Sequence, residues 1–284
     1  MSAPLPSYIY RPMTTADLSA AHALSVQLKW PHRLDDWAML HRVSKGFVVL
    51  DGERLIGSAF ACPQGDFTTI GLVIVSDDYQ GKGIGRKLME LALDACQSST
   101  PMLNATLAGA PLYSSQGFVE FGRIQQHQGQ VQAPTPAPLA DGEECRPLST
   151  ADQPRLLELA NAGSGLDRQA VLADLFPVVE QSVGIVRDGQ LQAFALMRPF
   201  GRGRCIGPVI AQNLAQAQHL IATLLSQVPG AFVRIDIPAD CGLSDWLEAA
   251  GLKKVDTVAQ MARGTPPQTI SGVQQFALVT QAIG

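Results

Sequence analysis

A short glycine-rich segment has the residue types and spacing that bind an anion. It reads Gln80-Gly81-Lys82-Gly83-Ile84-Gly85-Arg86-Lys87 and joins a β-branched segment to an amphipathic one. Glycines let backbone amides come close to a ligand, and free N–H groups at a helix N-terminus favour negative charge. Cations within the same segment strengthen this preference; they are Lys82, Arg86 and Lys87. The segment therefore predicts a phosphate-binding loop.

Two common phosphate-binding motifs do not fit this loop. A Walker A motif needs Ser or Thr after its Gly-Lys pair, but the last lysine of the segment is followed by Leu88. A dinucleotide fingerprint needs G-x-G-x-x-G and a later acidic residue. Here Gly81, Gly83 and Gly85 form G-x-G-x-G, and residues 101–106 contain no acid. A strand-to-helix turn needed only for packing is the other alternative, and the clustered cations favour ligand binding over it.

The apolar pattern predicts the elements that position this loop. Helices are expected at residues 15–28, with Thr15 as the cap, at 84–95 and at 111–116. Residues 30–42 are expected to have a break at Pro31 followed by a short helix, with Asp35 as its cap. Strands are expected at residues 47–50, 55–60, 68–75, 102–107 and 118–123. The turn Asp51-Gly52 joins the first two strands as a hairpin. The loop thus lies between a strand and a helix.

The sequence also repeats itself. RPMTTAD at Arg11–Asp17 matches RPLSTAD at Arg146–Asp152, with five identities in seven positions at an offset of 135. Further landmarks recur in the same order near this offset: Asp51-Gly52 with Asp188-Gly189, Ile70–Val73 with Ile206–Val209, and Gly117 with Gly251. A duplicated domain is therefore predicted. Because Gln125–Gly142 has the composition of a linker, we expect domains at residues 1–130 and 143–284, joined by residues 131–142.

These motifs resemble those of a known family. Gln80–Gly85 fits the Q/R-x-x-G-x-G/A signature of the GNAT superfamily of N-acetyltransferases, and Tyr113–Phe118 fits its later Y-x-x-x-G-F element. The resemblance extends from about Tyr10 to Arg123, with a degenerate second copy at Cys145–Gly264. It implies an α/β fold (α+β, with a mixed sheet), two tandem GNAT-like domains, and acetyl-CoA as the acyl donor.

The resemblance also implies roles for individual residues. The loop would hold the pyrophosphate of acetyl-CoA through Gln80, Gly81, Lys82, Gly83, Ile84, Gly85 and Arg86. Val73 and Val75 would pair with the pantetheine arm like an added strand, an amide of that strand would steady the oxyanion, and Asn104 would belong to the cofactor site. Tyr113 matches the residue that protonates the departing CoA thiolate; a plain core aromatic is the alternative.

The proton acceptor departs from the family pattern. An alkyl ammonium has a pKa near ~10, so its proton must be removed before transfer. Many relatives have an acidic residue in this strand, but residues 68–75 contain none, which leaves Asp66, His32 or a water relay. Trp30 and His32 lie where the family receives its acceptor, and substrate contact and packing both fit them. Trp37 is expected in the core.

Composition excludes several classes of function. The 284 residues have a net charge of -4, which argues against nucleic acid as a partner. The apolar runs are far shorter than the ~20 residues of a spanning helix, and Met1–Tyr10 lacks a signal-peptide pattern, so we expect no membrane partner and a cytoplasmic location. The five cysteines have no metal-binding spacing and are expected to be reduced, with no metal site.

The second copy lacks the loop chemistry. Aligned on Ile206-Gly207, it places Gln216–Ile221, which contains no glycine or cation, opposite Gln80–Gly85, and Leu247 in place of Tyr113. We expect one acetyl-CoA per chain and a structural or acceptor-shaping second domain. The predicted function is acetyl transfer to a primary amine of a small molecule or peptide. The alternatives are a non-catalytic CoA or acyl-CoA sensor and a duplicate without CoA affinity.

Overall fold

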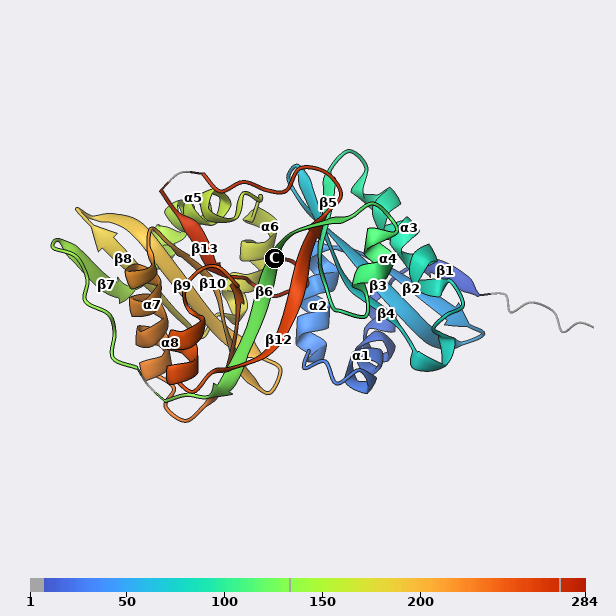
Figure 1. The fold of residues 1–284 in the computed structure, drawn as a ribbon, viewed down its shortest axis with the longest axis horizontal. Helices are drawn as coiled ribbons and strands as arrows, with labels where there is room; N and C mark the ends of the chain where they lie inside the picture. Colours follow the sequence, from blue (N-terminus) through green and yellow to red (C-terminus); the bar gives the residue numbers. More distant parts are fainter. Residues whose placement is uncertain (1–7, 133, 271) are drawn as a thin grey trace, which may run out of the picture.

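The chain forms two copies of one order of elements, coloured from blue to green and from green to red in Figure 1. The first half contains β1 (Ile9–Pro12), α1 (Leu18–Gln27), α2 (Leu34–Val43), β2 (Lys45–Asp51), β3 (Arg54–Gln64), β4 (Phe67–Val75), α3 (Ile84–Cys96), β5 (Thr100–Ala105), α4 (Ala110–Ser114) and β6 (Val119–Gln130). The second half contains β7 (Glu143–Pro147), α5 (Gln153–Ser164), α6 (Gln169–Leu175), β8 (Gln181–Arg187), β9 (Gln190–Phe200), β10 (Gly203–Ala211), α7 (Leu214–Ser226), β11 (Phe232–Pro238), α8 (Ser244–Ala249), β12 (Lys253–Ala262) and β13 (Gln274–Ala277). The predicted mixed α/β fold of two tandem domains is confirmed.

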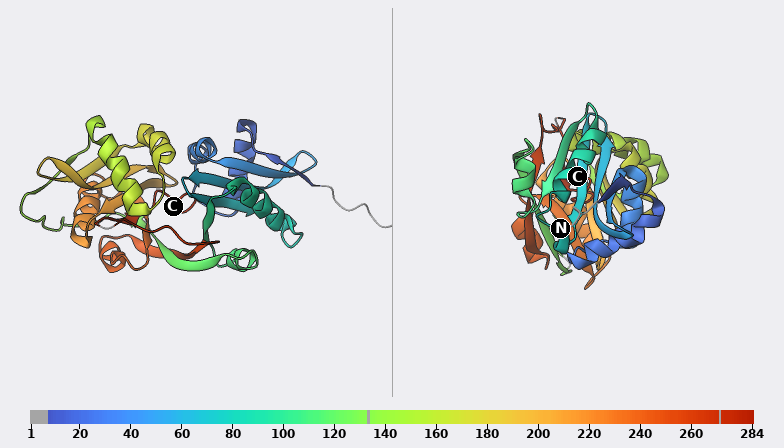
Figure 2. Two further views of the ribbon diagram at one scale, coloured as in Figure 1. Left: turned by 90° about the horizontal axis from the view of Figure 1, so that it is seen from above. Right: turned by 90° about the vertical axis from the view of Figure 1, so that its right-hand side faces the viewer.

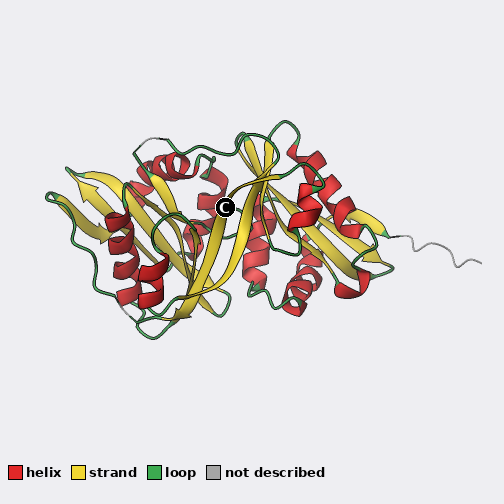
Figure 3. Cartoon of the chain, in the orientation of Figure 1, coloured by secondary structure: helices red, strands yellow, loops and turns green. Residues whose placement is uncertain are grey.

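One continuous sheet joins the two halves (Figure 3). The computed structural model describes residues 8–132, 134–270 and 272–284; residues 1–7, where most of the leader-peptide prediction falls, lie outside the described residues. Within these ranges the strand order is β1-β2-β3-β4-β5-β12-β6-β11-β10-β9-β8-β7, and β13 pairs with β10. No helix in these ranges is both long enough and apolar enough to cross a membrane.

The last strand of each half pairs with the sheet of the other half. β12 lies beside β5, with Asn104 opposite Gln260, and β6 lies beside β11, with His127 opposite Ile235. β6 and β12 also pair with each other and cross the centre of the molecule side by side (Figure 1). Neither half therefore completes its sheet alone, and the two halves form one interlocked unit.

Helices cover both faces of the sheet, because successive residues of its central strands are apolar and point to opposite faces. Phe60 and Cys62 of β3 pack in the core under α1 and α2, whereas Ala59 and Ala61 pack in the core under α3. The first of these cores continues into α5 and α6 of the second half. Figure 2 shows the two lobes that result, seen from above and end-on. The predicted core position of Trp37 is confirmed, because this side chain is fully buried.

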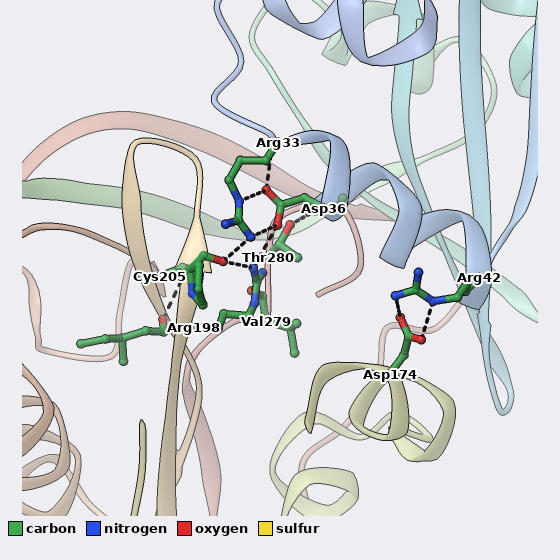
Figure 4. Close-up of polar contacts among 11 residues, drawn as sticks. Arg33, Asp36, Arg42, Asp174, Arg198, Cys205, Val279 and Thr280 are labelled. Atoms are coloured by element: carbon green, nitrogen blue, oxygen red, sulfur yellow. Dashed lines mark hydrogen bonds and ion pairs between the residues drawn. The ribbon is translucent and has the colours of Figure 1, made fainter. Parts of the chain in front are cut away.

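Two sets of polar contacts hold the lobes together (Figure 4). Asp36 accepts from the Arg33 backbone N–H at 2.8 Å and pairs with the buried Arg198 of β9 at 3.4 Å. Arg42 of α2 binds both oxygens of Asp174 in α6 at 2.7 and 2.9 Å. Removing either Asp36 or Arg198 would leave the other charge buried without its partner, which is costly.

The repeated heptad forms the same contact in each half. Arg11 binds both oxygens of Asp17 at 2.7 Å, and Arg146 binds those of Asp152 at 2.8 and 2.9 Å. Each aspartate also closes a capping box, with Thr14 in the first half and with Ser149 in the second. The identities of this motif thus encode one helix start, used twice.

Several local predictions were wrong. The cap of the turn Thr15–Asp17 that leads into α1 is Thr14 rather than Thr15. The N-cap of α2 is Arg33 rather than Asp35. In both cases the aspartate three residues on accepts from the backbone N–H of the cap. The short strand β1 was missed. Gln125–Gln130, which resembled a linker in composition, extends β6 because it pairs with β11 and β12.

Candidate active site

β4 and β5 run parallel and then separate, and a groove begins where they part. Their pairing joins Phe67–Ile70 to Thr100–Leu103 and ends there. Beyond this point no strand of the described chain pairs with the β5-facing edge of Gly71–Val75. A groove of about 710 Å³ runs along that edge to the N-terminus of α3. It offers unpaired strand backbone to an extended ligand.

A β-bulge changes the direction of the β4 backbone at the end of this groove nearest Gly71, which we call the head of the groove. The register between β3 and β4 shifts here, and Leu72 has a φ of 47°, which is uncommon for a bulky side chain. The Ser58 hydroxyl donates to the Leu72 carbonyl at 3.0 Å and fixes it on the β3 side. The bulge therefore interrupts the hydrogen-bond ladder between β3 and β4 beside the place where a bound group would lie.

The glycine loop forms an open cradle at the other end of the groove. Gly81 and Gly83 have φ values of 74° and 80°, and a Cβ at either would meet nothing within 4 Å. Gly83 caps α3 without a side-chain hydrogen bond, so the first-turn amides remain free for a ligand. Gln80 ties the loop to β4 by donating to the Val75 carbonyl at 3.3 Å. Residues with these properties fit the pyrophosphate of a CoA molecule.

The loop cations are placed unequally. Arg86 lines the groove, and its guanidinium lies 3.4 Å from the Ser115 hydroxyl. Lys82 donates to the Asp78 carbonyl at 3.0 Å and stacks over the Tyr79 ring, so its ammonium does not line the groove. Lys87 pairs with Glu90 on the helix surface.

Tyr113 projects from α4 into the middle of the groove. Gly109 makes room for its ring, since a Cβ there would lie 2.9 Å from the ring carbons. Phe118 packs against it with ring centroids 6.2 Å apart. Burial raises the pKa of Tyr113 to about 12, so the phenol stays protonated at neutral pH. Val73, Val75 and Ile84 line the same groove.

A second cavity opens from the head of the groove and is built by both halves. This inner pocket has a volume of about 120 Å³ and shares Trp30, Gly71 and Asn104 with the groove. Its further walls come from Thr280–Ala282, which follows β13, and from β11 and β12. A side chain at Gly71 would collide with the Ala282 backbone, so the last segment lies directly on β4.

The two residues predicted in the acceptor region lie in this pocket. Trp30 and His32 both line it, with ring centroids 6.3 Å apart. Burial lowers the pKa of His32 to about 3, and the charges of Arg234 and Arg198 act in the same direction, so the imidazole is neutral. Asp66, the carboxylate nearest in sequence, is exposed in the turn between β3 and β4 and lines neither cavity.

In the described part of the second half, the chain itself occupies the positions that correspond to the groove. Val209–Ala211 of β10 pair with β13 along the edge that corresponds to Val73–Val75 of β4. The predicted helix across Gln216–Ile221 is confirmed as part of α7. Asn213 caps this helix by accepting from the Gln216 backbone N–H at 3.0 Å. Strand edge and helix start are therefore both occupied by the chain itself.

Sequence reasoning missed the residues that the second half contributes to the inner pocket. They are Arg234, Asp256, Thr280, Gln281 and Ala282, and Gln126 of β6 in the first half was missed as well. The one available signal was the charged pair in Val233-Arg234-Ile235-Asp236, because charges within an apolar strand are usually paired or functional.

Comparison with known proteins gives one family for both halves. Residues 43–120 match a family model described as an acetyltransferase (GNAT) domain, and residues 156–277 match a second model with the same description.

Similar proteins cover most of the chain. It is 30% identical over 225 residues to the uncharacterized N-acetyltransferase YitH of Bacillus subtilis (strain 168), which covers 78% of each protein. It is 24% identical over 269 residues to the holothin acyltransferase of Pseudoalteromonas sp. (strain SANK 73390), covering 91% of this chain and 88% of that relative. The solved structure of a putative acetyltransferase from Pyrococcus horikoshii has the same fold, with a TM-score of 0.79, 17% identity, and coverage of 100% and 98%.

Proposed function

Because the chain belongs to the GNAT acetyltransferase family, we propose that it transfers the acetyl group of acetyl-CoA to a primary amine of a small molecule or peptide. The observation that carries this proposal is the continuous path from the glycine cradle, along the open edge of β4, to the inner pocket. A CoA thioester laid along this path would present its acyl group where the two cavities meet.

The residues of the path have distinct tasks in this proposal. Amides of the loop and of the first turn of α3 hold the pyrophosphate, with Gly81 and Gly83 leaving it room. Val73 and Val75 supply strand backbone to the pantetheine arm. Acetyl-CoA supplies the activated acyl group. A free amide of β4 beside the bulge stabilises negative charge on the acyl oxygen.

Tyr113 is assigned to the leaving sulfur. In the transfer an N–C bond forms and the C–S bond breaks, the amine loses a proton to water, and the thiolate gains one from the Tyr113 hydroxyl, which water then reprotonates. The raised pKa of Tyr113 keeps its hydroxyl protonated at neutral pH, so a donor is present beside the leaving sulfur. A merely structural tyrosine would not need to face the groove.

We propose further that one acetyl-CoA binds per chain and that the reaction takes place in the cytoplasm. The pairing of β13 with β10 and the capped start of α7 support a single cofactor site. The five cysteines are all unpaired, three of them buried, as suits a reducing compartment.

Release of CoA thiol tests the proposal. Acetyl-CoA is incubated with the full chain and a panel of amines, and thiol is followed with a chromogenic reagent. Amine-dependent release that disappears in Tyr113→Phe would support acetyl transfer. CoA binding without release for any amine would favour the sensor alternative, and absence of CoA binding would contradict both.

A further inference from the structure

Arg234 differs from the other deeply buried arginines because one of its terminal nitrogens has no hydrogen-bond partner in the described chain. Its Nε and Nη2 bind Asp236 at 2.9 to 3.1 Å, and Nη1 has no hydrogen-bond partner among the described residues. In Arg168 and Arg198 both terminal nitrogens have partners. Arg234 also lines the inner pocket, although it is only 6% exposed. Within the described chain Arg198 also leaves a donor unpaired, its buried Nε, but it does not line the pocket. Of these three, Arg234 is therefore the buried arginine whose unpaired donor is available to a ligand in the pocket.

The guanidinium of Arg234 is held in one orientation. It lies over the face of Phe200, with Cζ 5.3 Å from the ring centroid. Its partner Asp236 is fixed in turn by the Gln281 side-chain amide at 3.1 Å and is 1% exposed. A pre-oriented guanidinium with free N–H groups is the arrangement that recognises a carboxylate. The Arg234–Asp236 pair therefore holds the guanidinium fixed at the wall of the pocket, with Nη1 as the terminal nitrogen that the described residues leave unpaired.

Asn104 supplies a hydrogen-bond acceptor on the side of the inner pocket that faces the groove, whereas Arg234 supplies a donor. Its Nδ2 donates to the Gln281 carbonyl at 2.7 Å, which leaves Oδ1 as a buried acceptor without a partner in the described chain. Leaving such an atom unpaired costs free energy, and an N–H group of a bound molecule would remove that cost. Asn104 lines both cavities, whereas Arg234 lines only the inner pocket. A ligand that contacts both residues would therefore have its N–H end near the groove and its other end inside the pocket.

The remaining charge and the size of the pocket narrow the class of ligand. Besides Arg234, the charged side chain lining the pocket is the exposed carboxylate of Asp256, since His32 is neutral. A pocket with one cation and one anion suits a ligand that carries both signs. Its volume of about 120 Å³ admits only a small molecule.

We infer that the acceptor is a small amino acid or similar zwitterion, whose carboxylate binds Nη1 of Arg234 and whose amine lies against Oδ1 of Asn104, facing the groove. This inference rests on the proposed acetyl transfer, which gives the amine end its position. An amine without a carboxylate would leave the donors of Arg234 unpaired in a closed site, and sites built around a hydrogen bond reject ligands that lack it.

The test compares amino acids with their carboxamides, which keep the amine and lose the negative charge. The full chain is loaded with CoA, so that no transfer occurs, and each ligand is titrated by ligand-observed NMR. The acids are expected to bind about tenfold to a hundredfold more tightly than the matched carboxamides. Equal affinities in the wild-type protein would overturn the inference whatever the variants do.

Paired variants show whether Arg234 causes the preference. Arg234→Gln with Asp236→Asn removes both charges together, so that neither is left buried alone, and should bring the ratio of affinities close to one. Arg204→Gln with Glu180→Gln is the control, because this arginine–carboxylate pair, at 2.6 Å, joins β10 to the residue before β8 and lies outside the pocket. The control should keep the wild-type ratio. A ratio that survives in the Arg234 and Asp236 variant would contradict the assignment.

Thiol release measured in parallel separates this inference from the proposed function. Preferential binding of acids without release from acetyl-CoA would contradict acetyl transfer and leave the zwitterion site standing. Release that is equally fast with carboxamides or simple alkyl amines would support acetyl transfer and overturn the zwitterion site.

Discussion

The two halves share an order of elements but differ at one connection between a strand and a helix. In the first half, residues 76–83 lead from β4 to α3 and contain the glycine cradle; in the second, only residues 212–213 lead from β10 to α7. The first connection leaves helix amides free, whereas Asn213 binds those of α7. The same fold therefore either binds an anion or closes on itself, depending on this loop.

The strand edges beside these connections also differ, because one is free in the described chain and the other is paired. Gly71–Val75 present free backbone, whereas β13 occupies the corresponding edge of β10 and buries Phe276 there. The chain thus places its own strand where the first half would take a pantetheine arm. The segment after β13 then crosses to the first half and walls its inner pocket. The second half thus supplies part of the wall of the pocket that we propose as the acceptor site.

The largest effect is expected from closing the first cradle. Gly83→Asp should abolish detectable CoA binding, because a side chain and a negative charge would enter the open space at the start of α3. Binding is measured by fluorescence competition with a labelled CoA. Gly189→Asp is the matched control: its φ is 75°, nothing lies within 4 Å of its Cβ, and it is far from the groove in sequence and fold. Unchanged affinity in a folded Gly83→Asp protein would refute the site.

Tyr113→Phe should lower turnover by about 10² to 10⁴ and leave CoA affinity nearly intact, since only the proton donor is lost. Steady-state kinetics with a reactive amine measure this. Tyr10→Phe, which removes a hydroxyl from β1 outside the groove, serves as the control and should retain turnover. In the wild-type protein, ionisation of Tyr113 should cause no fall in rate until the pH approaches its pKa of about 12. Full activity of Tyr113→Phe would make this tyrosine a packing residue.

Phe276→Ala tests the strand that closes the second half. The side chain is fully buried, so its loss should lower the free energy of unfolding by about 3–5 kcal/mol. Phe121→Ala is the control, because Phe121 is 39% exposed and its loss should change stability by at most about 0.5 kcal/mol. Both are measured by urea denaturation. A second CoA site appearing in Phe276→Ala would show that β13 alone, rather than the missing loop, excludes the cofactor.

The smallest effect concerns a feature that the halves share. Asp17→Asn and Asp152→Asn should each lower stability at pH 7 by about 1 kcal/mol, since each removes one charge from a partly exposed pair. The paired arginine and the cap hold the pKa of each aspartate well below its ordinary value of 3.8. This contribution is therefore present above pH 3.8 and is lost as the pH falls below it.

Denaturation at pH 7 and at pH 3 checks this sign. The difference between each variant and the wild type should shrink at the lower pH, and Asp188→Asn, in an exposed turn, should differ little from the wild type at either. Clearly unequal effects of the two variants would mean that the halves do not use the motif alike.

The features that could be predicted from the sequence are those encoded by local patterns of residues. The loop, Tyr113 and the helix at Gln216–Ile221 follow from residue spacing within a few turns of chain. The exchange of β6 and β12 could not be predicted, because it joins residues more than a hundred positions apart and each strand would fit either sheet. The inner pocket depends on that exchange, so Arg234 and Gln281 stood out only after the fold was known. β13 is short and has no turn signal that would mark it as a strand.

Calorimetric titration of the full chain with acetyl-CoA tests the central comparison most directly, because it counts sites as well as detecting binding. We predict one site per chain in the wild-type protein and none in Gly83→Asp. Two sites per chain, or one site that persists in a folded Gly83→Asp protein, would show that the second half retains a working cradle and would contradict the account.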